Sequence, residues 1–198
     1  MVPQGRHAAA AGRQRVRRLI VFAAVVALTA GAKADPVSAP RVNVTEADGV
    51  FTVTAAFAVS EPAHTVIAVL TDYDRIPKFM PDVQISKVVE RTPAGAVVEQ
   101  EAVSKFMMFS KRVHLVLDVR EDGNRIRFRD RCGKSFAAYQ GSWTITEHDS
   151  LTVIDYELSA QPSFEVPGFV LKRLLKRDAA LLIDRLKTEI TARAQSRK

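Results

Sequence analysis

Residues 167–193 constrain the fold of this chain more than any other stretch. Apolar residues recur there at steps of three and four positions, at Leu171, Leu175, Ala179, Leu182, Leu186 and Ile190. This spacing predicts one apolar stripe along an α-helix of about seven turns. Pro167 stands where a first helical turn tolerates proline, and no glycine or proline follows Gly168 within the stretch. A helix this long with one apolar face needs a large apolar partner.

The sequence before this helix predicts that partner, an antiparallel β-sheet. Strands are expected at residues 42–46, 51–59, 83–91, 96–105, 112–121, 125–131, 136–147 and 151–161. Turn signals close the strands, and Asp122-Gly123 is a strong hairpin pair. Two short helices, at residues 63–70 and 73–79, interrupt the strands, with Ser60 as the expected N-cap of the first. The predicted class is α+β.

Alternation within the strands separates an apolar face of the sheet from a polar one. In residues 112–121, Leu115 and Leu117 point one way, whereas Asp118 and Arg120 point the other way. This pattern is typical of an antiparallel sheet that is covered on one side. We expect the helical stripe to pack on the sheet face that carries Trp143 and Tyr156.

Residues 1–34 have the order of a secretory signal peptide. A basic leader comes first, with Arg6, Arg13, Arg15, Arg17 and Arg18. An apolar run follows at residues 19–31, and then the Ala-x-Ala cleavage site Ala32-Lys33-Ala34. The run is shorter than the ~20 residues that span a bilayer, which favours cleavage over a retained membrane anchor. We therefore expect export to the periplasm with cleavage after Ala34, a linker at residues 35–41 and one domain at residues 42–193.

The net charge of +7 comes mostly from this leader. It holds six of the 29 basic residues and none of the 22 acidic ones, so 23 minus 22 leaves +1 for the rest. The positive charge of the chain is therefore no evidence for nucleic-acid binding, which needs a basic patch within the folded domain. Cys132 is the only cysteine, which excludes an intramolecular disulfide. We expect a monomer that binds no nucleic acid.

The sequence shows no clear catalytic constellation. The four histidines do not stand at metal-ligand spacing, and neither a Gly-x-Ser-x-Gly elbow nor a glycine-rich phosphate loop is present. We therefore predict no catalytic residue, metal or cofactor. Gln100 is expected to face the interior, where a buried amide needs either a neighbouring side chain or a ligand as its partner.

Three motifs resemble one known family. Residues 69–83 resemble the helix–helix signature of the START-like (SRPBCC) superfamily, in its polyketide cyclase/dehydrase and coenzyme-Q-binding branch. Gly141-Ser142-Trp143 resembles the family's penultimate strand, and residues 152–158 resemble its last strand. The resemblance covers residues 50–192. It implies a helix-grip fold, in which a curved antiparallel sheet wraps around the C-terminal helix and encloses an apolar cavity.

The apolar sheet face and this resemblance together predict a binding or transport protein. Its ligand would be a hydrophobic small molecule such as a lipid or an isoprenoid quinone. The expected cavity-wall residues are Gln100, Phe106, Leu115, Phe128, Trp143, Tyr156, Phe169 and Leu174. The alternatives are a polyketide cyclase/dehydratase-like enzyme that uses the same cavity, and an interaction protein with a filled core.

Two stretches raise the question of transient membrane contact. Phe106-Met107-Met108-Phe109 is apolar although it lies between two expected strands. It is either an adaptable lip at the cavity mouth or a plug of the core. Basic residues on the first turns of the last helix either meet anionic headgroups or are simply solvated. They are Lys172, Arg173, Lys176 and Arg177.

Overall fold

The computed structural model describes residues 40–106 and 109–196, without the side chains of residues 104–109. The strands are β1 (Arg41–Ala47), β2 (Val50–Val59), β3 (Val83–Thr92), β4 (Gly95–Phe106), β5 (Phe109–Asp122), β6 (Arg125–Asp130), β7 (Phe136–Glu147) and β8 (Thr152–Pro162). The helices are α1 (Ala63–Leu70), the 3-10 turn η1 (Tyr73–Arg75), α2 (Ile76–Phe79) and α3 (Gly168–Gln195). The predicted signal peptide lies outside the described residues.

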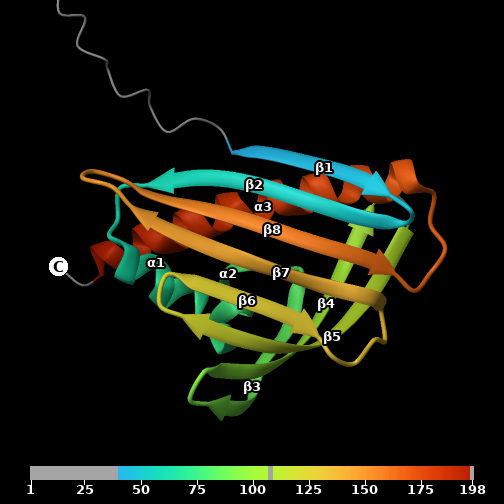
Figure 1. Cartoon of the computed structure of the whole chain (residues 1–198), viewed down its shortest axis with the longest axis horizontal. Coiled ribbons are helices and arrows are strands. Elements are labelled where there is room, and N and C mark those ends of the chain that lie inside the picture. Colours follow the sequence, from blue (N-terminus) through green and yellow to red (C-terminus); the bar gives the residue numbers. More distant parts are fainter. Residues whose placement is uncertain (1–39, 107–108, 197–198) are drawn as a thin grey trace, which may run out of the picture. The chain divides into compact units, whose positions relative to one another are not determined.

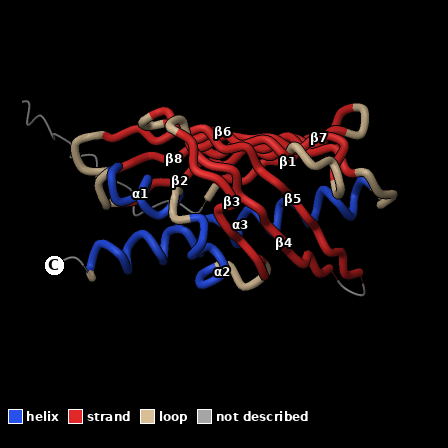
Figure 2. Tube along the Cα trace, turned by 90° about the horizontal axis from the view of Figure 1, so that it is seen from below, coloured by secondary structure: helices blue, strands red, loops and turns tan. Residues whose placement is uncertain are grey.

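The strands form one antiparallel sheet in the order β1-β2-β8-β7-β6-β5-β4-β3. The segment α1–η1–α2 connects β2 to β3, which lie near opposite edges of the sheet (Figure 1). Figure 2 shows the sheet curving over the helices, which all lie on one side of it. The predicted α+β helix-grip fold is therefore confirmed.

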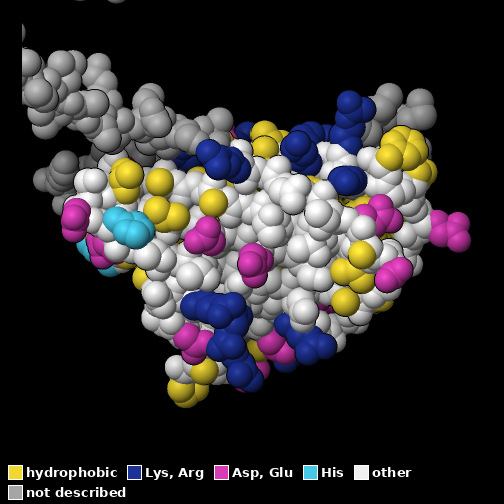
Figure 3. Space-filling model, turned by 45° about the horizontal axis from the view of Figure 1, so that its top comes forward, with side chains coloured by type: hydrophobic (Ala, Val, Ile, Leu, Met, Phe, Trp, Pro, Cys, Tyr) yellow, Lys and Arg dark blue, Asp and Glu magenta, His cyan; other side chains and the backbone are white. Residues whose placement is uncertain are grey.

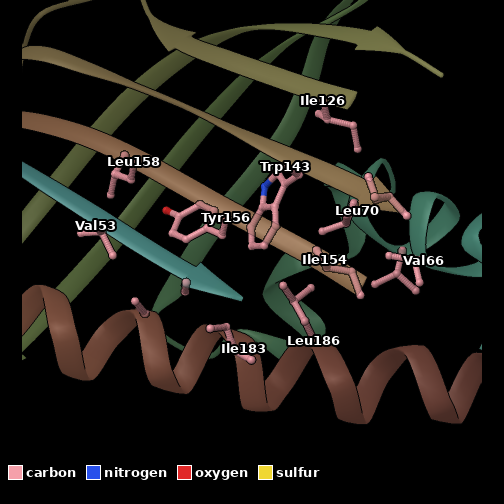
Figure 4. Packing of buried hydrophobic residues seen from close by; sticks show 14 of the residues in the cluster. Val53, Val66, Leu70, Ile126, Trp143, Ile154, Tyr156, Leu158, Ile183 and Leu186 are labelled. Atoms are coloured by element: carbon pink, nitrogen blue, oxygen red, sulfur yellow. The ribbon is translucent and has the colours of Figure 1, made fainter. Parts of the chain in front are cut away.

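The α3 helix buries one stripe of side chains against the sheet. The buried residues are Leu171, Ala179, Ile183, Leu186 and Ile190. Leu175 and Leu182, which the spacing also placed on the stripe, are only partly buried against the core. Ile183, which the spacing missed, is 0% exposed. Figure 4 shows Ile183 and Leu186 reaching from α3 towards Ile154 and Tyr156 of β8.

The last turns of α3 are tied to the α1–η1 segment by Arg193. Its Nη1 donates to Asp72 Oδ2 at 2.8 Å and to the Ala68 carbonyl at 3.3 Å. Its Nε donates to Glu189 Oε1 at 2.6 Å, one turn earlier on the helix. These charge-assisted bonds hold α3 at the end where α1 closes the space between helix and sheet.

The other face of the sheet is polar, as the alternation predicted. Arginines on β5 and β6 gather there, with Arg120 and Arg127 in register as direct cross-strand partners. Asp118 and Asp122 lie beside them and pair with Arg131 and Arg127 respectively. Figure 3 shows dark blue Lys and Arg side chains clustered with acidic ones on the lower part of the face in view.

Two local expectations were wrong. The N-cap of α1 is Pro62 rather than Ser60, and no side chain caps this helix. The hairpin between β4 and β5 also extends further than predicted, because the pairing continues to Phe106 opposite Phe109. Met107 and Met108 lie outside the described residues, so the lip and plug interpretations of this tip both stay predictions.

Candidate ligand-binding cavity

A cavity of about 510 Å³ lies between the inner face of the sheet and α3. Side chains from β2, β4–β8, α1–η1–α2 and α3 line it, and most of them are apolar. Its volume is within the ~300–1,000 Å³ typical of small-molecule pockets. Alternation alone could not predict a space between the sheet and α3. The structure shows such a space, and it is large enough for a small-molecule ligand.

Aromatic rings form much of the sheet wall of the cavity. On the sheet they are Phe128, Phe136, Tyr139, Trp143 and Tyr156, and Phe164 joins them from the β8–α3 connection. Trp143 and Tyr156 are register partners on β7 and β8, and their rings stack with centroids 4.3 Å apart. Tyr139 packs on Phe136 and Phe128, at centroid distances of 4.9 Å and 6.0 Å. The wall is thus broad and apolar, and its rings are tilted relative to one another.

Gly141 makes room for this wall. A Cβ on Gly141 would lie 2.5 Å from Cζ of Phe128 and 2.3 Å from the carbonyl oxygen of Glu157. Both distances are shorter than van der Waals contact. The Glu157 oxygen belongs to the backbone, so it cannot move away as a flexible side chain can. Glycine at this position therefore lets Phe128 lie across β7.

The phenols of this wall are protonated at neutral pH. Burial raises the pKa of Tyr139 to about 12, and the Asp130 carboxylate adds to this effect. Burial also raises the pKa of Tyr156 well above its ordinary value, with a further contribution from Tyr139. The pKa of Tyr73 is raised by burial and by its hydrogen bond to Glu121. All three side chains can therefore donate a hydrogen bond but cannot act as bases near pH 7.

The side-chain amide of Gln100 is hydrogen-bonded within the protein. Its Nε2 donates to Ser86 Oγ on the neighbouring strand β3, at 3.1 Å. The side chain still lines the cavity, so its amide is part of the wall. Of the two partners that the sequence left open, the structure shows the neighbouring side chain.

The cavity reaches the surface where part of its lining is exposed, and we call this region the mouth. It is defined by the exposed lining residues Asp82, Ser110, Lys111, Glu165 and Leu181. They come from the α2–β3 connection, the start of β5, the β8–α3 connection and α3. Lys111 Nζ lies 4.6 Å from the ring centroid of Phe164, so a cation–π contact links β5 to the β8–α3 connection.

Comparison with known protein families identifies the family of this chain. Residues 59–187 match the family described as "Polyketide cyclase / dehydrase and lipid transport". The chain belongs to this family. The START-like resemblance of the sequence is thereby confirmed. No curated protein matches the chain significantly.

Solved structures of the superfamily share the fold. A START superfamily protein from Mycobacterium smegmatis aligns with a TM-score of 0.63 at 16% identity, over 71% of this chain and 97% of that one. The Zhui aromatase/cyclase from Streptomyces sp. R1128 gives 0.63 at 15% identity, over 73% and 96%. A STAR-related lipid transfer protein from Xanthomonas axonopodis gives 0.55 at 16%, over 78% and 99%. At these identities the likeness establishes the fold alone.

Six of the eight expected wall residues line the cavity of this family member. They are Gln100, Leu115, Phe128, Trp143, Tyr156 and Leu174. The side chain of Phe106 lies outside the described residues. Phe169 is not on the wall but 77% exposed, because it stands two residues, or about 200° of helical turn, before the buried Leu171.

Sequence reasoning missed four aromatic wall residues, Tyr73, Phe136, Tyr139 and Phe164. A register shift between Phe136 and Ala138 lets Phe136 and Tyr139 both face inward, although they are three positions apart. Phe164 stands in the β8–α3 connection, where alternation does not apply. The sequence could have indicated Tyr139, because alternation places it on the same strand face as Trp143.

The described part of the chain holds neither a membrane-spanning helix nor a metal-binding cluster. Across residues 40–106 and 109–196, no helix is both long and apolar enough to cross a bilayer. In the same residues, no three His, Cys, Asp or Glu side chains converge as metal ligands.

Proposed function

We propose that this protein is an exported carrier that holds one hydrophobic small molecule, a lipid or an isoprenoid quinone. The observation that carries the proposal is the 510 Å³ cavity, whose wall is mostly apolar and opens at a defined mouth. Each Å² of apolar ligand surface removed from water there contributes about 25 cal/mol to binding before association costs. The family's description includes lipid transport, which agrees with this use of the cavity. Export is supported by the charge pattern and cleavage site of residues 1–34.

Filling the cavity from within tests the proposal. Ala102 is a half-buried residue of β4 that lines the cavity. With delipidated wild-type protein, a saturating lipid or quinone should raise the melting temperature, by the equivalent of about 2.7 kcal/mol at a hundredfold excess over Kd. With Ala102→Trp the indole should occupy the ligand's space, so the same ligands should produce no rise.

The matched control is Glu99→Trp, which puts the same side chain on the polar face. Glu99 stands on β4 and its side chain is 41% exposed, near His114. This variant should respond to ligands as the wild type does. A wild-type protein that shows no rise with phospholipids, fatty acids or isoprenoid quinones would count against the carrier function.

A polyketide cyclase/dehydratase-like enzyme is the second candidate. It is favoured by the buried phenols of Tyr139 and Tyr156, which could polarise a ketone by donating to its oxygen. Their raised pKa values make them poor bases, so proton abstraction would need another group. Conversion of a linear poly-ketone to a cyclic product, lost in Tyr156→Phe, would support this function over carriage.

Membrane contact is proposed for one face of α3 beside the mouth. Phe169, Lys172, Arg173 and Lys176 stand at positions i, i+3, i+4 and i+7, and all four are exposed. Such a face suits an anionic bilayer, where an aromatic ring enters the interface and cations meet headgroups. The same helix contributes Leu174 and Leu181 to the cavity lining, so docking here would bring the mouth to the membrane.

Charge reversal of this face should slow ligand transfer without harming the fold. Replacing Lys172, Arg173 and Lys176 by Glu removes about 1 kcal/mol of attraction per cation and adds repulsion. We expect transfer to anionic vesicles to slow at least about tenfold, with the melting temperature unchanged. Reversing Arg120, Arg125 and Arg129 on the outer sheet face is the matched control and should leave transfer unchanged. Equal slowing by both sets would refute a specific docking face.

A further inference from the structure

The cavity wall carries three hydrogen-bond donors for which residues 40–106 and 109–196 supply no acceptor. They are the hydroxyl groups of Tyr139 and Tyr156 and the indole N–H of Trp143. Tyr156 is 5% exposed, Trp143 is 9% exposed and Tyr139 is partly buried, so their polar atoms face the cavity space and are not sealed within the protein. Buried donors of this kind are normally satisfied, because leaving one unpaired costs free energy.

One tyrosine of the wall does have a hydrogen-bond acceptor within the protein. All three tyrosines of the chain line the cavity. Of these, Tyr73 donates to Glu121 Oε1 at 2.9 Å, and the Arg91 guanidinium lies 5.6 Å from its ring centroid. The unpaired hydroxyls of Tyr139 and Tyr156 are thus a local feature of the sheet wall.

The hydroxyl of Tyr156 is directed towards apolar lining residues of the cavity. Figure 4 shows its oxygen directed between Val53 and Leu158, in the layer between the sheet and α3. Both of these residues line the cavity and carry no polar side-chain atom. An acceptor that reaches this hydroxyl must therefore arrive as part of a bound molecule or a water.

The charged groups of the lining lie elsewhere. Asp82, Lys111 and Glu165 belong to the mouth, and Asp178 on α3 accepts a 2.7 Å hydrogen bond from Arg177 Nη2. A carboxylate or phosphate placed against Tyr156 would lose its hydration without meeting a cation. A neutral acceptor fits the aromatic wall, and an anion does not.

We propose that the ligand carries a neutral carbonyl oxygen, of a ketone, ester or amide, that accepts a hydrogen bond from Tyr156 at the inner wall, where Tyr139 offers a second donor. Its hydrocarbon part extends from there towards the mouth. This inference rests on the proposed function, because it assumes that the cavity holds a hydrophobic ligand. It adds the chemical class of the ligand and the direction in which it is held.

Two planar probes that differ by one carbonyl test the inference. Fluorene and 9-fluorenone have the same ring skeleton, and quenching of Trp143, the only tryptophan, reports binding of either. Tyr156→Phe should weaken fluorenone about fivefold, as for one lost hydrogen bond, and fluorene less than about twofold. Tyr73→Phe is the matched control, since its hydroxyl already has a protein acceptor, and it should leave the ratio of the two Kd values unchanged.

Infrared spectra provide a readout that does not depend on affinity. The carbonyl stretch of bound fluorenone should lie at lower wavenumber in the wild type than in Tyr156→Phe, because hydrogen bonding weakens the C=O bond. If Tyr156→Phe fails to fold, the wild-type spectrum and that of Tyr139→Phe carry the same test. A stretch in the wild type equal to that in a hydrocarbon solvent would overturn the inference.

The outcomes distinguish a failure of the carbonyl inference from a failure of the carrier function. If both probes bind and Tyr156→Phe affects them equally, the carbonyl inference is wrong while the carrier function stands. If neither probe binds the wild type, both are wrong. Tighter binding of fluorene-9-carboxylate than of fluorenone would also overturn the inference, since it would show that an anion is preferred.

Discussion

Trp143→Ala is expected to lower the free energy of unfolding by about 3–5 kcal/mol, the range found when buried aromatic residues are truncated. Trp143 is 9% exposed and stacks on Tyr156 at the centre of the β7–β8 pair. Removing the indole costs its burial and leaves Tyr156 without its stacking partner. It also enlarges an existing cavity, so the surrounding side chains cannot collapse to fill the gap. Urea denaturation followed by circular dichroism measures the loss.

The control for this prediction is Trp143→Phe, which keeps an aromatic ring on Tyr156. We expect a loss of roughly one third of the alanine value, because most of the stacking and apolar contact remains. Equal losses for Phe and Ala would show that the stack contributes little. A loss below about 1 kcal/mol for alanine would mean that Trp143 is not part of the closed wall described here.

Ile183→Ala should lower the free energy of unfolding by about 2–5 kcal/mol. Ile183 is 0% exposed and lies in the same core cluster as Ile154 and Leu186. It is the position at which α3 is most deeply buried near the middle of its length, so truncation leaves a void between the helix and the sheet. Chemical denaturation measures the change as a shift in midpoint at constant slope.

Leu181→Ala is the matched control on the same helix. Leu181 is 42% exposed at the mouth, so a similar loss of side-chain volume should cost less than about 1 kcal/mol there. If the two variants lose equal stability, α3 does not dock through the face that carries Ile183. Comparable small losses in both would point to a helix that packs loosely on the sheet.

The element order could be read from the sequence because local patterns determine it. Hydrophobic alternation predicted the strands, and pairs such as Asp122-Gly123 separated them, while the spacing from Leu171 to Ile190 predicted α3. The stripe was shifted at Ile183 because apolar residues at adjacent positions, Leu182 and Ile183, allow two choices. Only the orientation of the docked helix decides between them.

The cavity was less predictable, because its volume depends on how far the sheet curves away from α3. Alternation assigned Trp143 and Tyr156 to the inner face but said nothing of the distance to the helix. The register shift near Phe136 and the β8–α3 connection at Phe164 are nonlocal features of pairing and chain direction. Phe169 was expected on the cavity wall but is exposed, because it stands about 200° of helical turn from Leu171 of the buried stripe.

Native mass spectrometry of the protein purified gently from its own cell is the most direct test of the carrier function. We expect a main species whose chain begins at Asp35 and which carries one hydrophobic molecule that collisional activation releases. Ala102→Trp, prepared in the same way, should carry no such molecule. A ligand-free wild type, or an identical adduct on Ala102→Trp, would contradict the claim that the cavity between the sheet and α3 holds the cargo. A mass that includes residues 1–34 would contradict the proposed cleavage.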